Sequence, residues 1–346
     1  MHILFATSQA TALMRGGVRT QVLQTKEALE QLGVHVTLFD SWKDFDPHDY
    51  DLIHIFTANM ATYHLARAMK VHSLPLIISP VFYTRRSEKI VRNVITTDRL
   101  INRFTRGIWS DYGLIAEMCG WAEMVTPNTT DEAALFINGF GVQRTNVTVV
   151  PNGVEERFAK ASPELFEKEF GLKNFILSVG HIGPERKNVM RLIEALERID
   201  HPAAIIGRIE DTPSGRACLE RAKRNPRLLI MNMLPHDSML LASAYASCSV
   251  FVLPSQFETP GIAALEAALA GANVVITPYG GTKDYFGSDA DYVDPASVDS
   301  IVQGIHRSLQ KQKNHIIGER LKNEFAWRKI GESMKAVYER VLSSRV

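Results

Sequence analysis

The stretch from Cys248 to Gly271, CSVFVLPSQFETPGIAALEAALAG, most constrains what this chain can fold into. It opens with a short run of β-branched and aromatic residues (250–253), which is typical of a buried parallel strand. The alanine-rich half that follows predicts a helix closed by Gly271. We expect Thr259 to cap this helix and Pro260 to occupy its first position, where a missing N–H costs nothing.

A helix that begins at the carboxyl end of a buried strand is where α/β sheets bind ligands. The first amides of such a helix have no partner within it, and they attract anions. Two carboxylates bracket this turn, Glu258 in the loop and Glu266 inside the helix. Acidic residues near a helix start are also ordinary partners of the helix dipole, so the spacing alone leaves both interpretations open.

Strand and helix patterns alternate along most of the remaining chain, which indicates an α/β fold with parallel sheets. A length of 346 residues favours two domains over one. With 45% of residues hydrophobic, there is ample material for both cores. The net charge of +1 provides no general attraction to nucleic acid, and we expect no nucleic-acid partner.

The cysteine pattern and the first residues bear on the compartment. Cys119, Cys218 and Cys248 have neither metal-ligand spacing nor even pairing, which predicts reduced thiols in a cytoplasmic protein. The first residues contain only a short apolar run, which predicts a strand rather than a signal peptide. No stretch approaches the ~20 apolar residues of a membrane-spanning helix.

Two other predicted strand ends carry glycines or cations. The strand 2–6 leads into a loop with Gly16 and Gly17 and a helix over 21–31. These glycines do not form a Gly-x-Gly-x-x-Gly motif, and a tight turn with positive φ explains them equally well. The strand 175–179 leads into a loop that ends in Arg186 and Lys187, which spacing alone cannot distinguish from a solvated charge pair.

Further elements follow from the same patterns. We expect strands within 34–40, 51–56, 75–82, 146–154, 203–208 and 227–248, and helices at 61–70, 188–199, 298–310 and 331–342.

The segment 85–121 is basic and amphipathic. Its arginines and lysines up to position 106 face only Glu88 and Asp98, and apolar residues interleave with them. The basic residues are Arg85, Arg86, Lys89, Arg92, Arg99, Arg103 and Arg106; the apolar ones are Ile101, Phe104, Ile108, Trp109, Leu114 and Ile115. Such a segment can lie on an anionic membrane surface. We favour the commoner alternative, a solvated helix face with its apolar side in the core.

Together these motifs resemble the retaining glycosyltransferases of family 4. Glu258 and Glu266 fall on the two acidic positions of that family's signature, Lys187 matches its loop lysine, and residues 151–154 (PNGV) match a motif at the end of its first domain. The resemblance implies the GT-B fold, with two Rossmann-like doubly wound domains that face a central cleft. The expected parts are an acceptor-side domain (1–155), a nucleotide-sugar donor domain (156–325) and a final helix (326–346) that packs back on the first domain.

The resemblance also implies roles for individual residues. Glu258 would contact the donor sugar, Glu266 would accept hydrogen bonds from the ribose hydroxyls, and Lys187 would bind the diphosphate. Glu258 and Lys187 are the expected catalytic residues. Further donor contacts are implied for Gly16, Gly17, His181, Arg186, Met233, Leu234, Thr259, Pro260, Gly261 and Ile262, and acceptor contacts for Tyr83 and Thr84.

Three departures from the family pattern bear on these roles. His181 stands where the family has an arginine, so Arg186 would have to supply that cation or the leaving group is held less tightly. Pro260 removes one N–H from the turn, and the segment 79–84 lacks the family's acceptor-side histidine. Three Asp-x-Asp matches (44–46, 49–51 and 289–291) lie outside the setting of a metal-using transferase, and we expect no metal.

The implied function is metal-independent, retaining transfer of a sugar from a nucleotide-diphosphate donor, with a UDP-sugar or GDP-sugar foremost. The acceptor would be a glycan, a lipid-linked molecule or a small molecule, as in polysaccharide biosynthesis. The nucleotide sugar is a co-substrate, and no cofactor is expected. A GT-B nucleotide-sugar epimerase and a catalytically inactive nucleotide-sugar-binding protein are the alternatives. The location would be cytoplasmic, with a peripheral membrane contact through 85–121 left open.

Overall fold

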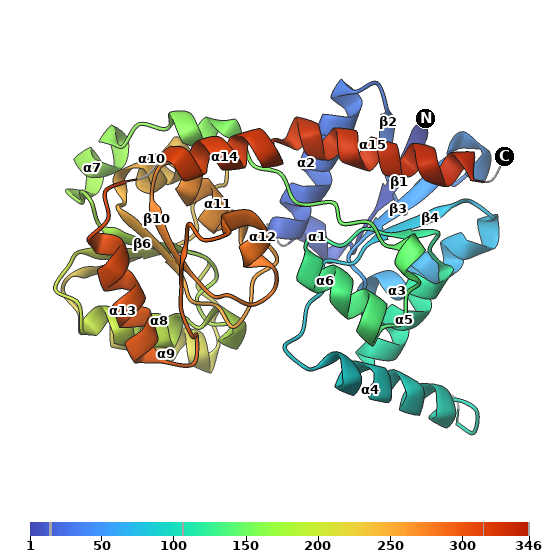
Figure 1. Ribbon diagram of the computed structural model, residues 1–346, viewed down its shortest axis with the longest axis horizontal. Helices are drawn as coiled ribbons and strands as arrows, with labels where there is room; N and C mark the ends of the chain where they lie inside the picture. The colour runs from blue at the N-terminus through green and yellow to red at the C-terminus, as the bar shows by residue number, and fades with distance from the viewer. Residues whose placement is uncertain (14–15, 106, 314, 345–346) are drawn as a thin grey trace. The chain divides into compact units, whose positions relative to one another are not determined.

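The computed structural model describes residues 1–13, 16–105, 107–313 and 315–344. Arg106, named above, lies outside the described residues. The chain divides into two compact units, one made of Met1–Gly153 with Trp327–Val346 and the other of Val154–Ala326 (Figure 1). Each unit is built on one parallel sheet.

The first unit has a five-stranded parallel sheet with the order β2-β1-β3-β4-β5. Its strands are β1 (His2–Ala6), β2 (His35–Leu38), β3 (Leu52–Phe56), β4 (Leu76–Ser79) and β5 (Met124–Val125). Strands β3 and β4 are buried throughout because helices cover both faces of the sheet.

The helices of the first unit pack as two layers. On one face lie α3 (Met60–Met69), α4 (Glu88–Ile101) and α5 (Asp111–Trp121); on the other lie α2 (Gly17–Gln31) and α15 (Trp327–Ser343). Two short helices, α1 (Ala10–Leu13) and α6 (Thr130–Ala134), complete the unit.

The last helix, α15, is joined to the first unit's sheet by a buried polar link. The Tyr338 hydroxyl lies 2.7 Å from Nδ1 of His54 on β3, and the other ring nitrogen of His54 lies 2.9 Å from the Ser79 hydroxyl on β4. Burial lowers the pKa of His54 to about 3, so the imidazole is neutral. This link, together with apolar contacts, makes α15 an integral part of the first unit.

The second unit has a six-stranded parallel sheet with the order β11-β10-β9-β6-β7-β8. Its strands are β6 (Ile176–Val179), β7 (Ala203–Ile206), β8 (Leu228–Met231), β9 (Val250–Leu253), β10 (Asn273–Ile276) and β11 (Asp291–Tyr292). The chain winds outward from β6 to β8 and then returns to the other side of β6 with β9. The point where the strand order reverses therefore lies between β6 and β9, and α/β sheets bind ligands at such points.

Helices cover both faces of the second sheet. On one side lie α7 (Glu164–Phe170), α10 (Met239–Ser247), α11 (Ile262–Leu269), α12 (Thr282–Phe286) and α14 (His315–Phe325); on the other lie α8 (Val189–Glu197), α9 (Pro213–Ala222) and α13 (Val298–Leu309).

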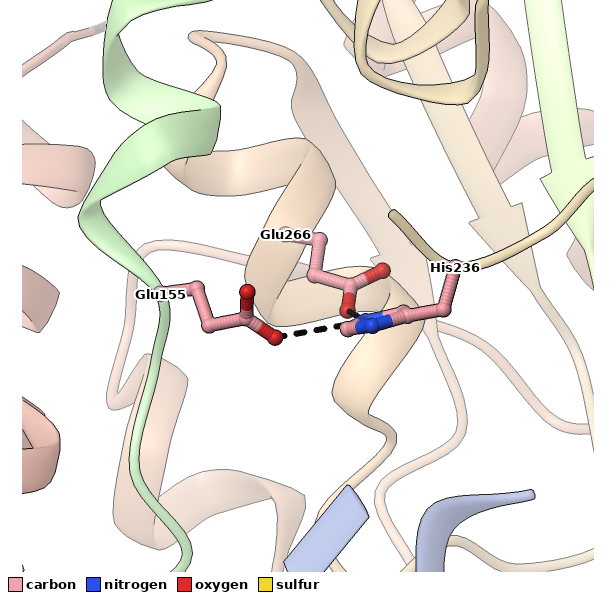
Figure 2. Close-up of side chains that lie close together, drawn as sticks. All are labelled: Glu155, His236 and Glu266. Carbon is pink, nitrogen blue, oxygen red and sulfur yellow. Dashed lines mark hydrogen bonds and ion pairs between the residues drawn. The ribbon is translucent and has the colours of Figure 1, made fainter. Parts of the chain in front are cut away.

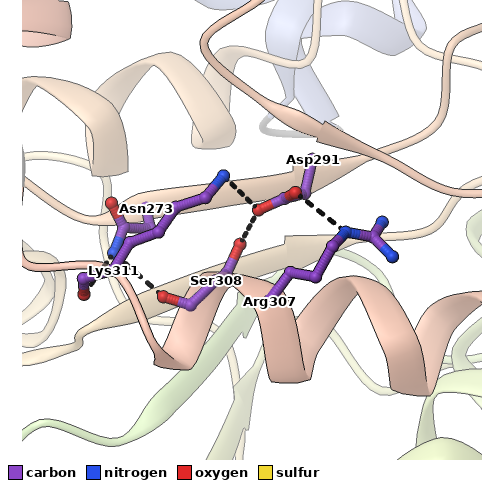
Figure 3. Close-up of polar contacts among 5 residues, drawn as sticks. All are labelled: Asn273, Asp291, Arg307, Ser308 and Lys311. Carbon is purple, nitrogen blue, oxygen red and sulfur yellow. Dashed lines mark hydrogen bonds and ion pairs between the residues drawn. The ribbon is translucent and has the colours of Figure 1, made fainter.

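A polar network fastens the edge strand β11 to the end of α13 (Figure 3). The Asp291 carboxylate accepts hydrogen bonds from Arg307 (3.2 Å), Lys311 (2.8 Å) and the Ser308 hydroxyl. Asn273 on β10 donates to the backbone carbonyls of Ser308 (3.1 Å) and Lys311 (3.2 Å). Asp291, part of one Asp-x-Asp match, therefore has a structural role at the sheet edge.

The structure corrects one predicted strand and adds helices that were not predicted. The segment 146–154 forms only isolated bridges, Val125 to Val147 and Val154 to Ala326. Its partner β5 is only two residues long, and Pro151 has no N–H to extend a ladder. The helices α9 and α14 were not predicted from the sequence. The three cysteines are free, in keeping with the predicted reduced thiols, and they are buried.

Candidate active site

Two loops meet at the reversal point of the second sheet. The loop after β6 (180–188) and the loop after β9 (254–261) leave neighbouring strands at the same sheet edge. The Gln256 amide donates to the Arg186 carbonyl at 2.8 Å, and the Asn188 side chain donates to the Pro254 carbonyl at 2.8 Å. These bonds fix the two loops against each other, which brings together the cations of the first and the carboxylate of the second.

Lys187 and Glu258 form a buried ion pair between these loops. The Lys187 Nζ donates to Glu258 Oε1 at 2.6 Å, and the Arg186 guanidinium lies 3.7 Å from the other carboxylate oxygen. Burial would raise the pKa of Glu258, but the cations of Lys187 and Arg186 outweigh burial and lower that pKa. Burial lowers the pKa of Lys187, and the attraction of Glu258 opposes this change. The result is an ionised carboxylate held by two cations.

The loop after β10 supports the backbone of Glu258. The Glu258 amide donates to the Tyr279 carbonyl at 3.0 Å. The next residue, Gly280, has φ +96°, and a Cβ there would lie 2.4 Å from the Glu258 carbonyl oxygen. Only glycine fits this approach without a shift. Sequence reasoning missed the contact of Gly280 with Glu258.

The helix α11 begins later than predicted. Its first residue is Ile262, and Gly261, with φ +89°, precedes it in the left-handed conformation. The predicted cap at Thr259 and first position at Pro260 are therefore wrong: both residues lie in the loop, because the chain turns into the helix at the glycine. Pro260 accordingly removes none of the helix's first amides. Gly271 ends α11 as predicted, with φ +92°.

Glu266, on α11, is part of a second charged cluster (Figure 2). His236, in the loop after β8, donates from Nε2 to Glu266 at 2.7 Å, and the same nitrogen lies 3.5 Å from Glu155. The hydrogen bond with Glu266 raises the pKa of His236. Arg157 joins the cluster, with its Nε 2.8 Å from Glu155 and its Nη2 2.5 Å from the His236 carbonyl.

Sequence reasoning missed His236 and Glu155 as members of this cluster. His236 closely follows Met233 and Leu234, two of the implied donor contacts, and that position was its only signal. The side chains of Glu155, His236 and Glu266 offer ligand atoms within 4.8 Å of one another and could hold a divalent cation. A protonated His236 between the two carboxylates would pair with the same oxygen atoms without a metal ion. We therefore interpret the cluster as a set of ion pairs.

His181 does not supply the positive charge that the family's arginine has at this position. Burial lowers the pKa of His181, and the nearby cation of Lys187 lowers it further. Its Nδ1 lies 3.6 Å from Glu210. Arg186, by contrast, donates to the Phe257 carbonyl at 3.1 Å within the Glu258 loop. Arg186 and Lys187 are thus the cations at this sheet edge that contact Glu258.

The remaining predicted residues belong to the first unit. Gly16 has φ −169° and ψ −179°, an extended backbone open to any residue, and a Cβ there would meet nothing within 4 Å. The alternative of a positive-φ turn is therefore wrong for Gly16; Gly17 is the first residue of α2. Tyr83 and Thr84 follow β4 and are half-buried, and the Tyr112 hydroxyl donates to Thr84 at 3.3 Å. Ligand contacts from these residues stay a prediction.

Comparison with known families bears directly on this geometry. Residues 163–324, which include the whole of the Lys187–Glu258 site and the His236 cluster's loop and helix, match the family model of glycosyl transferases group 1. Over these residues, which make up just under half of the chain, the protein is similar to that family. The predicted resemblance is thereby confirmed.

The sequence relatives of this chain are distant. The sulfoquinovosyl transferase SQD2 of Arabidopsis thaliana is 25% identical over 295 residues, which cover 80% of this chain and 54% of that protein. The chain spans about half the length of the first sequence relatives that it matches.

Two solved structures share the fold over nearly the whole chain. A sucrose-phosphate synthase from Thermosynechococcus elongatus has a TM-score of 0.77 at 16% identity and covers 99% of this chain and 100% of its own. Anabaena HepE, in a complex with UDP-glucose, has a TM-score of 0.71 at 19% identity and covers 99% of this chain and 100% of its own. The predicted GT-B fold is confirmed.

Proposed function

We propose that this protein is a retaining glycosyltransferase of group 1 that uses a nucleotide-diphosphate sugar without a metal ion. The observation that carries the proposal is the buried pair of Lys187 and Glu258 beside the start of α11, at the reversal point of the second sheet. The donor side of the reaction is assigned to the second unit and the acceptor side to the first. The acceptor is a glycan, a lipid-linked molecule or a small molecule.

The site has the charges that departure of a nucleotide diphosphate requires. When the bond between the sugar and the phosphate breaks, negative charge accumulates on the leaving phosphate oxygens. Lys187 and Arg186 supply positive charge, and the first amides of α11 supply donors with no partner in the helix. In the free protein Glu258 neutralises Lys187; with a donor bound, the lysine is shared between the carboxylate and the phosphate.

Retention follows from attack on the same face of the sugar. In this scheme the acceptor oxygen forms a bond to the anomeric carbon as the bond to the phosphate breaks, and the departing phosphate oxygen takes the acceptor's proton. Glu258, held in place by Lys187, accepts hydrogen bonds from donor-sugar hydroxyls and does not form a covalent intermediate. Glu266 accepts hydrogen bonds from the ribose, and His236 orients its carboxylate.

The choice of the first nucleotide base to test is supported by a structural neighbour. HepE is a structural neighbour that was solved with UDP-glucose, which supports a UDP-sugar as the first donor to test. The loop after β8, with Met233 and Leu234, is the proposed base-binding segment. Because the Met233 side chain is 40% exposed, the segment has apolar surface available for a base.

Thermal unfolding with UDP, GDP, ADP or dTDP, each with magnesium and with EDTA, tests the proposal first. A ligand at about 100 times its Kd stabilises the folded protein by about 2.7 kcal/mol. This corresponds to several degrees, at roughly 2–4 °C per kcal/mol for a chain of this size. We expect UDP to stabilise equally with EDTA, and Lys187→Ala to remove the effect. The matched control is Lys173→Ala, an exposed lysine paired with Glu167.

The outcomes separate the alternatives. Failure of every nucleotide to stabilise the protein would contradict the donor site. Nucleotide binding without turnover of the sugar donor in the presence of any acceptor would indicate a binding protein. Conversion of the donor to its epimer without an acceptor would indicate an epimerase.

A further inference from the structure

The helix α4 and residues 102–105 and 107–109, which follow it, form an exposed surface, here called the α4 surface. Only Val91 and Ile95 of α4 are fully buried, against the core of the first unit. Other large apolar side chains remain in solvent: Ile90, Leu100, Ile101, Phe104, Ile108 and Trp109. The sequence-based interpretation was that the apolar side of this segment faces the core. It holds for Leu114 and Ile115, which are buried, and is wrong for the other apolar residues that it named: Ile101, Phe104, Ile108 and Trp109.

Some of the apolar residues of α4 lie along one side of the helix. Ile90, Val94 and Ile101 are spaced by four and seven residues, so they lie on one side of the helix, next to the buried side. Phe104, 83% exposed, and Trp109, 56% exposed, continue the apolar surface beyond the helix end. In Figure 1, α4 lies at the lower margin of the first unit, with its far end and the following loop outermost. Contiguous exposed apolar residues of this kind mark an interaction surface.

The described charged residues of the α4 surface are mostly positive. They are Lys89, Arg92, Arg99 and Arg103, against Glu88 and Asp98, in a chain whose net charge is only +1; Arg85 and Arg86 directly precede the helix. Both acidic side chains are engaged within the protein. Glu88 accepts a hydrogen bond from Asn138 at 3.2 Å, and Asp98 accepts one from the Ser110 amide at 3.0 Å. The described basic residues of this segment are all exposed.

We propose that the α4 surface docks on an anionic lipid bilayer. Phe104 and Trp109 would enter the interface, where aromatic side chains are favoured, and the arginines would reach the lipid phosphates. Among the described residues, no helix is both long enough and apolar enough to cross a membrane, so the contact is peripheral. A second copy of the chain fits this surface less well, because a two-fold contact would place the like charges against each other.

Sedimentation with lipid vesicles tests the proposal. We expect the full chain to bind phosphatidylcholine vesicles that contain phosphatidylglycerol and not vesicles of phosphatidylcholine alone. Binding should weaken as salt is raised from about 0.1 M to about 1 M, because the Debye length falls from ~10 Å to ~3 Å. Free phosphate should not compete, since a bilayer and not a single phosphate fills the surface.

Two variants of the α4 surface and two matched controls sharpen the test. We expect Arg99→Glu/Arg103→Glu to weaken binding ~10-fold or more, and Phe104→Ser/Trp109→Ser to weaken it comparably. The controls are Arg224→Glu/Arg328→Glu for charge and Trp42→Ser for an exposed aromatic residue, since Trp42 is 95% exposed. Stabilisation by UDP and the circular dichroism spectrum should match the wild type in every variant, because all these side chains are exposed.

Three outcomes would overturn the proposal. One is no binding to anionic vesicles; another is equal binding by the α4-surface variants and the wild type. The third is a dimer, detected by sedimentation velocity without lipid, that Phe104→Ser/Trp109→Ser abolishes. That result would identify the surface as a protein interface.

Discussion

Lys187 and Glu258 come from loops that follow two neighbouring strands, yet their charged groups lie 2.6 Å apart and are largely buried. The pair exists because β6 and β9 are adjacent while their positions in the chain are far apart. The charge of each residue is therefore compensated only when the loop that carries the other residue has its native conformation.

Removal of either partner should destabilise the second unit. Lys187→Ala and Glu258→Ala should each lower the free energy of unfolding by about 3 kcal/mol, because each leaves a buried charge without its partner. The double variant should lose less than the sum of the two. Urea denaturation of the four proteins measures this coupling. Strictly additive losses would show that the two side chains do not interact in solution.

Glu258→Ala should also lower sugar transfer by ~10²-fold or more, the scale of a lost electrostatic contact in an active site. The KM for the donor should change less than kcat, because the proposed contact orients the sugar as charge develops. Initial rates with UDP-glucose provide the measurement, and the exposed Glu169→Ala is the control. Full transfer activity in Glu258→Ala would remove this residue from the mechanism.

Gly280→Ala should impair both stability and turnover. The new Cβ would meet the Glu258 carbonyl oxygen at 2.4 Å, so the loop that contains Glu258 must shift. The matched control is Gly287→Ala, where φ is also positive (+52°) but a Cβ meets nothing within 4 Å. Both variants carry the backbone cost of about 1–2 kcal/mol. Only Gly280→Ala should lower kcat as well; equal rates in the two variants would contradict the role of this contact.

The His236 cluster should make stability depend on pH. The hydrogen bond to Glu266 raises the pKa of His236 above 6.5. The stabilisation from this histidine is then fully present below its unfolded pKa and is lost as pH rises through the folded pKa. His236→Gln should therefore lose the wild type's stability advantage mainly at acidic pH, with Glu155 and Arg157 unchanged. Melting temperatures of the wild type and His236→Gln across a range of pH measure this effect, with the exposed His64→Gln as control. A difference between wild type and His236→Gln that stays constant with pH would show that the cluster does not titrate.

Glu132, in the first unit, should make stability depend on pH in the opposite direction to an ordinary ion-paired carboxylate. It accepts hydrogen bonds from the amides of Phe82 and Asn128, both at 2.7 Å. Burial nevertheless raises its pKa from 4.5 to about 7. The folded protein thus binds this proton more tightly than the unfolded chain does, and stability falls as pH rises through that range.

The shift in the pKa of Glu132 from 4.5 to about 7 corresponds to a change of about 3 kcal/mol in the free energy of unfolding. Glu132→Gln cannot titrate, so relative to the wild type it should gain about that much between about pH 5 and about pH 8. Urea denaturation at a series of pH values measures the gain. Parallel stability curves for the two proteins would mean that Glu132 stays ionised throughout.

Much of the fold of the second unit was predictable, because its strands and helices have clear periodicity and the loops of interest follow strands. The strand before Pro254 and the helix before Gly271 are as expected. The start of α11 was not predictable, because Thr259, Pro260 and Gly261 are all residue types that commonly occur where a helix begins. Only the backbone shows that the turn into the helix occurs at Gly261.

The contacts that sequence reasoning missed join distant segments. His236 and Glu266 are 30 residues apart, and their pairing depends on how the loop after β8 lies against α11. For α4, periodicity predicted an amphipathic helix but could not tell which apolar residues pack. Ile95 is buried and Ile101 is exposed, although the two have identical side chains. What separates them is the extent of the neighbouring elements, which no local pattern encodes.

The position of α15 has a consequence for how the protein is made. Ile330, Met334 and Tyr338 pack in one apolar cluster with residues of β1 and α2. The first unit therefore contains a core whose last side chains are translated after the entire second unit. On the ribosome, the second unit, which is one continuous segment, can reach its native packing first. The amino-terminal sheet must wait for the release of the final helix, so truncation near the carboxyl end should damage the unit that was synthesised earliest.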